Sequence, residues 1–86
     1  MTEAQLLEKV KSALGVTGNY QDATLTEYIH EVKEFLADAG VSATVLASDS
    51  VSGIVARGVS DLWNYGAGGD LSPYFMKRAT QLALKG

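Results

Sequence analysis

The sequence predicts an all-α fold, a compact bundle of about four main helices plus a short helical turn. Apolar residues recur every three or four positions in four separate segments, which is the spacing that gives a helix one core-facing stripe. No stretch alternates apolar and polar residues for long enough to predict a strand. Glycines and the only proline, Pro73, separate the segments, as expected of residues that commonly end and begin helices.

The first predicted helix spans residues 3–14. Thr2 is followed three residues later by Gln5, which predicts a capping box at the start of the helix. Gly15 is expected to end it, because glycine adopts the left-handed conformation that follows a last helical turn. The inner face is predicted to carry Leu6, Leu7, Val10, Ala13 and Leu14.

The second predicted helix spans residues 25–39 and is the most clearly amphipathic segment. Thr24 and Glu27 have the spacing of another capping box, and Gly40 is expected to end the helix. The opposite side of this helix is charged. The predicted inner face carries Leu25, Tyr28, Ile29, Val32, Phe35, Leu36 and Ala39.

Residues 42–48 predict a short helical turn capped by Ser42. A third long helix is expected from Asp49 or Ser50 to Tyr65. Its apolar residues spread over about 200° of the helix circumference, so several neighbours, or partly another protein, must cover it. This helix is therefore expected to be central in the bundle.

Two further features of the third helix suggest specific contacts. Gly53 and Gly58 each cost about 1 kcal/mol relative to alanine in a helix interior, which suggests close approach of another backbone. Arg57 and Asp61 are four residues apart on the narrow polar face, where they are expected to form an ion pair.

A glycine-rich loop at residues 66–71 is expected before the last helix. Ser72 and Pro73 predict the start of that helix as cap and first residue. Its inner face is predicted to carry Phe75, Met76, Ala79, Leu82 and Ala83, and its outer face Tyr74, Lys77, Arg78 and Lys85. Nothing divides the chain, so residues 1–86 are expected to form one domain.

The composition excludes several classes of protein. The 86 residues include no cysteine, which excludes a disulfide framework and a thiolate zinc site. The net charge is -3, which argues against tight binding of DNA through its phosphates. No apolar run approaches the roughly 20 residues of a membrane span, and the charged start of the chain is unlike a signal peptide. We expect no membrane association.

The only histidine gives no convincing catalytic or metal site. Glu27 and His30 form one Glu-x-x-His step, but a di-metal bundle needs two such steps and two further glutamates. The helical phase also places His30 opposite the apolar stripe. No second histidine is present to activate a serine nucleophile. The sequence therefore predicts no enzyme activity, no catalytic residue, no metal site and no cofactor.

A helix-turn-helix-like element is the alternative interpretation. Residues 36–45 run from the end of one predicted helix through a glycine into a short second one. The residues that would face the bases include Ser42 and Thr44 but no basic side chain, whereas base reading needs Arg, Lys, Asn or Gln. A small DNA-binding or regulatory module remains the second hypothesis for function.

Charge and aromatic residues predict a protein-interaction surface instead. Residues 1–72 carry four basic and ten acidic side chains, and residues 73–86 carry three basic and no acidic ones. These charges either form an ordinary solvated helix face with favourable C-terminal cations or allow the basic face of one copy to meet the acidic face of the next. Aromatic residues cluster around the end of the third helix, where they either close the core or anchor an interface, and at the start of the last helix. The candidate interface residues are Trp63, Tyr65, Tyr74, Lys77, Arg78 and Lys85.

The same region resembles a known family. The run GIVARGVSDLWNYG at residues 53–66, followed by LSPYF at residues 71–75, is similar to the small head–tail connector (adaptor) proteins of tailed bacteriophages and prophages, often labelled DNA-packaging proteins. The similarity extends upstream to Tyr28-Ile29 and to the Ala39–Ser42 turn, so it covers nearly the whole chain.

The resemblance implies a structural protein at the head–tail junction of the virion, made in the bacterial host cytoplasm. Family members are small helical bundles that assemble as a ring under the portal, extend the DNA channel and present a surface to a tail or stopper protein. The implied partners are further copies of this chain, the portal, a tail or stopper connector, and passing DNA that is not bound sequence-specifically. We expect an isolated subunit to be monomeric and to assemble on the portal. The family has no known catalytic residues.

Overall fold

A computed structural model of the protein describes residues 2–65 and 71–84, apart from the side chain of Tyr65. All regular elements in these ranges are helical, which confirms the predicted all-α class. The elements are α1 (Glu3–Leu14), α2 (Asp22–Asp38), α3 (Ala43–Leu46), a 3₁₀ turn (Asp49–Val51), α4 (Ser52–Tyr65) and α5 (Pro73–Leu84). The predicted loop at 66–71 lies outside the described residues except for Leu71.

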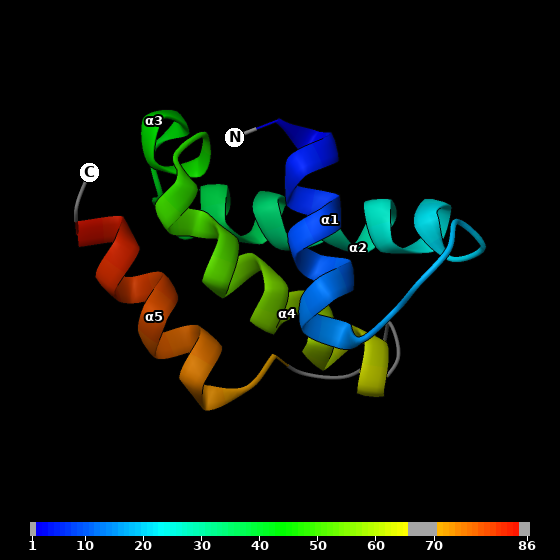
Figure 1. The fold of residues 1–86 in the computed structure, drawn as a ribbon. Helices are drawn as coiled ribbons and strands as arrows, with labels where there is room; N and C mark the ends of the chain where they lie inside the picture. The colour runs from blue at the N-terminus through cyan, green and yellow to red at the C-terminus, as the bar shows by residue number, and fades with distance from the viewer. Residues whose placement is uncertain (1, 66–70, 85–86) are drawn as a thin grey trace.

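Helix α4 is the centre of the bundle, as predicted. It packs against α1, α2 and α5, and the 3₁₀ turn leads into it (Figure 1). The molecule is a slab of 36 × 27 × 16 Å with a radius of gyration of 12.0 Å. The apolar residues that spread over more than half of α4 are thus covered by three helices. The residues of the 3₁₀ turn and α4 that are buried in the core are Val51, Ile54, Val55, Val59 and Leu62.

The two glycines of α4 differ in their surroundings. A Cβ atom added to Gly58 would lie 2.7 Å from Phe75 Cε2 and 2.9 Å from Val32 Cγ1, both closer than side chains normally approach. Gly58 therefore has close neighbours, but these are the side chains of Phe75 and Val32 rather than the backbone of another helix. The same expectation for Gly53 is wrong, because nothing lies within 4 Å of its added Cβ.

Helix α1 begins and ends as its local sequence predicts. The backbone N–H of Gln5 donates to Thr2 Oγ1 (3.1 Å), and the Thr2 N–H donates to Gln5 Oε1 (2.9 Å), which completes the capping box. Gly15 follows the last turn with a φ of 73°. Ala13 was expected on the inner face but is exposed, since it lies at the edge of the apolar arc.

Helix α2 begins three residues earlier than predicted, at Asp22. The Thr24–Glu27 capping box is therefore wrong, and Gln21 occupies the cap position without a side-chain hydrogen bond. The first residue of the helix is instead held by an ion pair of 2.8 Å with Lys11 of α1. Gly40 follows the end of the helix with a φ of 103°, as expected.

The remaining boundaries agree closely with the sequence. Ser42 Oγ accepts a hydrogen bond of 3.3 Å from Val45 N–H at the start of α3. Ser72 Oγ accepts one of 3.3 Å from Phe75 N–H, and Pro73 is the first residue of α5. Met76 was predicted on the inner face but is 46% exposed. Helix α5 packs chiefly on α4, so its buried face is narrower than the apolar pattern suggests.

Candidate protein-interaction surface

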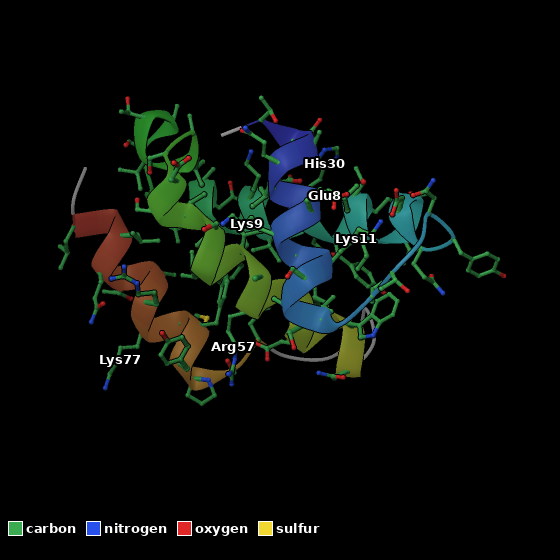
Figure 2. All side chains as sticks on the ribbon, viewed as in Figure 1. Glu8, Lys9, Lys11, His30, Arg57 and Lys77 are labelled. Carbon is green, nitrogen blue, oxygen red and sulfur yellow. The ribbon has the colours of Figure 1, made fainter. Side chains whose placement is uncertain are left out.

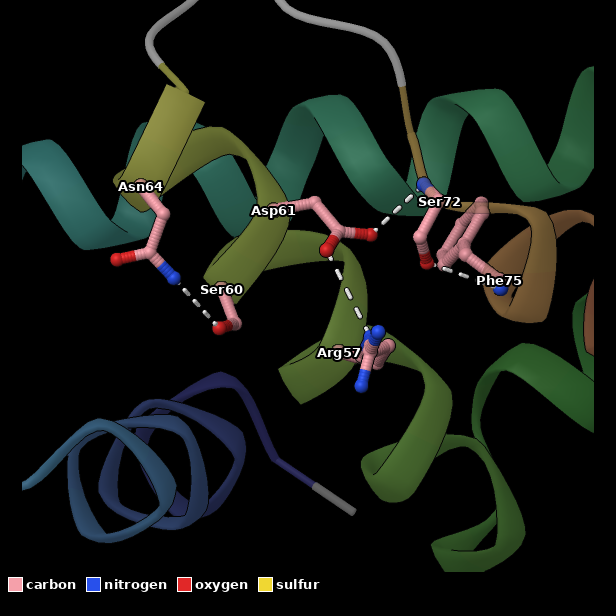
Figure 3. Close-up of polar contacts among 6 residues, drawn as sticks. All are labelled: Arg57, Ser60, Asp61, Asn64, Ser72 and Phe75. Carbon is pink, nitrogen blue, oxygen red and sulfur yellow. Dashed lines mark hydrogen bonds and ion pairs between the residues drawn. The ribbon is translucent and has the colours of Figure 1, made fainter.

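The junction of α4 and α5 is organised by one buried carboxylate, Asp61. Its Oδ2 accepts a hydrogen bond of 3.0 Å from the backbone N–H of Ser72, and its Oδ1 lies 3.6 Å from Arg57 Nε (Figure 3). The predicted Arg57–Asp61 ion pair is thus present, with Asp61 only 5% exposed. A buried carboxylate is costly unless it is paired and hydrogen-bonded, and here both partners sit where α5 begins.

Arg57 also contacts the first exposed aromatic of α5. Its guanidinium carbon lies 5.4 Å from the centroid of the Tyr74 ring, within the distance of a cation–π interaction. The side chain of Arg57 is half exposed, at 50%. Arg57 therefore links the buried carboxylate of Asp61 to the exposed surface of α5.

A hollow of about 340 Å³ lies on the outer side of α5, lined by Tyr74, Lys77, Arg78 and Gln81. We call it the α5 hollow. Tyr74 is 60% exposed. Arg78 Nη1 donates to Gln81 Oε1 at 3.0 Å, which holds two of the lining side chains together. The hollow combines an aromatic ring, two cations and an amide, and none of the described residues that line it is acidic.

The structure brings together three of the six predicted interface residues. Tyr74, Lys77 and Arg78 line the α5 hollow, and Gln81 joins them without having been predicted. Trp63 does not line it. Its ring instead meets Tyr28 of α2 edge to face, with centroids 6.5 Å apart, and is partly buried against the core. The side chain of Tyr65 and the whole of Lys85 lie outside the described residues.

A second notable surface feature is the loop between α1 and α2, which the sequence did not single out. Lys11 is buried, at 6% exposure. Its Nζ donates to the carbonyl oxygen of Gly18 at 2.5 Å and lies 2.8 Å from Asp22 Oδ1. The loop thereby presents Tyr20 at 93% exposure. The signal that could have predicted this arrangement is a lysine at the edge of an apolar arc, followed by a glycine-containing loop and an aspartate.

The outer side of α2 carries a line of acidic residues. Glu27, Glu31, Glu34 and Asp38 follow one another at helical spacing, and all four are exposed. They lie opposite the buried side chains of α2. None of the four takes part in an ion pair among the described residues. We call this surface the α2 acidic ridge.

The surroundings of His30 give no metal site in the part of the chain that the structure describes. His30 Nε2 contacts Glu3 Oε1 of α1, and both side chains are largely exposed (Figure 2). No group of three or more potential ligands is close enough together in residues 2–65 and 71–84 to hold a metal ion. The Glu27–His30 step therefore lies on a solvated surface.

Comparison with known proteins matches one family. The model of the phage gp6-like head-tail connector protein family matches residues 4–59, more than half of the chain. No curated protein and no solved structure matches. The matched range covers α1, α2, α3 and the first part of α4, so it includes the α1–α2 loop and the α2 acidic ridge. The α5 hollow lies beyond it. Among the described helices, none is long and apolar enough to cross a membrane.

Proposed function

Because the chain belongs to the phage gp6-like head-tail connector family, we propose that it assembles as a ring under the portal. In that position the ring extends the DNA channel and docks a tail or stopper protein. The family is one of structural virion components that interact with portal and tail proteins, not a family of enzymes. The match over residues 4–59 is the observation that carries this proposal.

The distribution of charge supports ring assembly. A subunit of a closed ring makes heterologous contacts, so it needs two different surfaces that complement each other. The α2 acidic ridge carries four exposed carboxylates, and the α5 hollow carries Lys77 and Arg78. Such charges orient neighbouring copies more than they add affinity. The predicted interface residues Tyr65 and Lys85 belong to the same end of the chain and are part of this proposal.

The acidic net charge fits a channel protein that DNA must pass. Tight phosphate binding needs several Lys or Arg side chains on one surface. The chain has a net charge of -3, and seven Lys and Arg residues stand against ten Asp and Glu residues. DNA is therefore a passing partner that is not bound sequence-specifically.

The helix-turn-helix alternative has no structural observation in its favour. Helix α3, the candidate reading helix, has four residues and no basic side chain. Its first exposed residues are Ala43 and Thr44. This helix is shorter than the elements that read base edges in the major groove.

Electron microscopy of the protein mixed with its cognate portal tests the proposed function. We expect a ring of density added to the portal, and a monomer when the protein is analysed alone by light scattering. The portal alone and the portal with an unrelated acidic helical protein are the controls. If a molar excess of subunit adds no density to the portal, the ring proposal is wrong.

A further inference from the structure

The α1–α2 loop presents one aromatic side chain from a well-held backbone. Tyr20 is the most exposed large hydrophobic residue among those described, at 93%. The loop is closed by Val16 N–H donating to the Lys11 carbonyl (2.9 Å) and by Asp22 N–H donating to the Asn19 carbonyl (3.2 Å). The buried ammonium of Lys11 adds a hydrogen bond to the Gly18 carbonyl and an ion pair with Asp22. The side chain of Tyr20 is thus exposed to solvent, while hydrogen bonds hold the backbone of the loop that carries it.

Such a tyrosine is suited to binding another protein. Tyrosine is enriched among the residues that dominate interface energetics, and a loop already held in one conformation loses little entropy when it binds. The neighbouring residues, Asn19 and Gln21, are neutral and polar. The loop therefore has an apolar centre with a polar surround, as a small interface requires.

The α5 hollow is a suitable receptor for this ring. Tyr74 offers an exposed aromatic face, and aromatic pairs gain from offset or edge-to-face contact. Arg78 and Lys77 offer cations that are attracted to the face of an incoming ring. The hollow of about 340 Å³ has room for one tyrosine side chain.

The charges around the two features are complementary. Asp22, at the start of α2, is already paired with Lys11, so the acidic charge next to the loop is that of the exposed Glu27 and Glu31 of the α2 acidic ridge. Within residues 2–65 and 71–84, the lining of the α5 hollow includes two cations and no acidic residue. A second copy of this chain therefore supplies a matching partner for each feature.

The two features also lie on opposite sides of the molecule. The α1–α2 loop projects at one edge of the bundle, and α5 forms the opposite edge (Figure 1). Lys11, which holds the loop, and Lys77 of the hollow are correspondingly far apart in Figure 2. Tyr20 therefore cannot reach the α5 hollow of its own subunit. A loop of one copy in the hollow of the next gives a head-to-tail contact, the kind that generates rings.

We propose that Tyr20 of one copy inserts into the α5 hollow of the neighbouring copy. The proposal rests on the proposed ring function and names the lateral contact. A buried tyrosine removes on the order of 150–250 Å² from water, far below the roughly 1,200–2,000 Å² of a stable interface. The contact alone is therefore weak, and it becomes effective when the portal holds neighbouring copies close together.

Cysteine cross-linking of the full chain tests the contact, because the natural sequence contains no cysteine. An Asn19→Cys variant is mixed with a Gln81→Cys variant in the presence of the cognate portal and treated with a short bis-maleimide. In the matched control, Asn19→Cys is mixed with an Ala37→Cys variant, since Ala37 is exposed on α2 outside the hollow. Peptide mass spectrometry measures the mixed product in each case.

We expect the 19–81 product to exceed the 19–37 product by about two- to tenfold, the range that an aromatic contact supplies. Adding Tyr20→Ser to the Asn19→Cys variant is expected to abolish this excess, and Tyr20→Phe to retain it. Because Tyr20 is exposed, these changes leave the core intact. Equal 19–81 and 19–37 yields, or an excess that survives Tyr20→Ser, would overturn the proposal.

Electron microscopy of the variants bound to the portal shows whether the Tyr20 contact or the proposed ring function has failed. Complete rings formed equally by the natural chain and by Tyr20→Ser would leave the ring function standing and overturn the Tyr20 contact. A specific 19–81 cross-link from a chain that adds no density to the portal would support the contact and contradict the ring function.

Discussion

The backbone N–H of Ser72 donates a hydrogen bond of 3.0 Å to Asp61, across the connection between α4 and α5. The acceptor is a carboxylate that is 5% exposed. The interaction fixes the residue that caps α5, so it places the start of the helix that carries Tyr74, Lys77 and Arg78. Asp61 thus helps to fix the position of the α5 hollow.

Removal of this carboxylate is expected to loosen α5. Asp61→Ala leaves the Ser72 N–H and Arg57 without their partner, and we expect the free energy of unfolding to fall by about 1–3 kcal/mol. Asp61→Asn keeps one acceptor oxygen and is expected to lose less. Urea denaturation measures the loss, and hydrogen exchange should locate it in α5. Ser60→Ala is the control, because its hydrogen bond to Asn64 is exposed. Equal effects of all three changes would contradict this assignment.

The two glycines of α4 are expected to respond in opposite directions to alanine. Gly58→Ala places a Cβ 2.7 Å from Phe75 and 2.9 Å from Val32, and overpacking of this kind costs about 1–3 kcal/mol. Gly53→Ala meets no neighbour and should stabilise the helix by up to about 1 kcal/mol. Thermal denaturation of the two variants gives the comparison. A stabilised Gly58→Ala would show that Phe75 and Val32 move away without cost.

The buried ammonium group of Lys11 is expected to stabilise the α1–α2 loop. Lys11→Met keeps much of the apolar stem but removes the ammonium from Asp22 and Gly18, with an expected loss of about 1–3 kcal/mol. Limited proteolysis should then cut the loop faster. Lys9→Met is the matched control, because Lys9 is an exposed lysine of the same helix. If both variants are cut at the rate of the natural chain, Lys11 does not hold the loop.

Reversing charge in the α5 hollow is expected to weaken assembly on the portal without unfolding the subunit. Lys77 is exposed, so Lys77→Glu should leave stability within about 0.5 kcal/mol of the natural chain. The variant should form fewer complete rings in electron micrographs, and raising the ionic strength should reduce its difference from the natural chain. Thr80→Glu adds an acidic group on an exposed position of α5 that does not line the hollow. Equal ring formation by both variants would exclude a role for Lys77.

Features set by neighbouring residues could be predicted from the sequence. The Thr2–Gln5 capping box and the Ser72–Pro73 start of α5 depend on side chains within three residues of the backbone groups that they cap. The central place of α4 followed from its wide apolar surface. The start of α2 could not be predicted in this way, because Lys11 holds Asp22 from another helix.

The residues that line the α5 hollow were predicted only in part, for the same reason. Tyr74, Lys77 and Arg78 were identified because charge and aromatic character are visible in the sequence. Gln81 is neutral, and it lines the hollow only because one helical turn separates it from Lys77. Tyr20 is a single aromatic residue in a polar loop, and its exposure could not be predicted because it depends on the conformation of the loop backbone. The exposed position of Met76 likewise depends on how little of α5 its neighbours cover.

The two sides of α5 contribute differently to folding. Phe75, Ala79 and Leu82 hold it in the core, whereas Lys77 on the outer side is exposed and takes no part in that packing. Substitutions on the outer side are therefore expected to cost little in folding. The surface that the helix presents to solvent can change while the bundle beneath it stays the same.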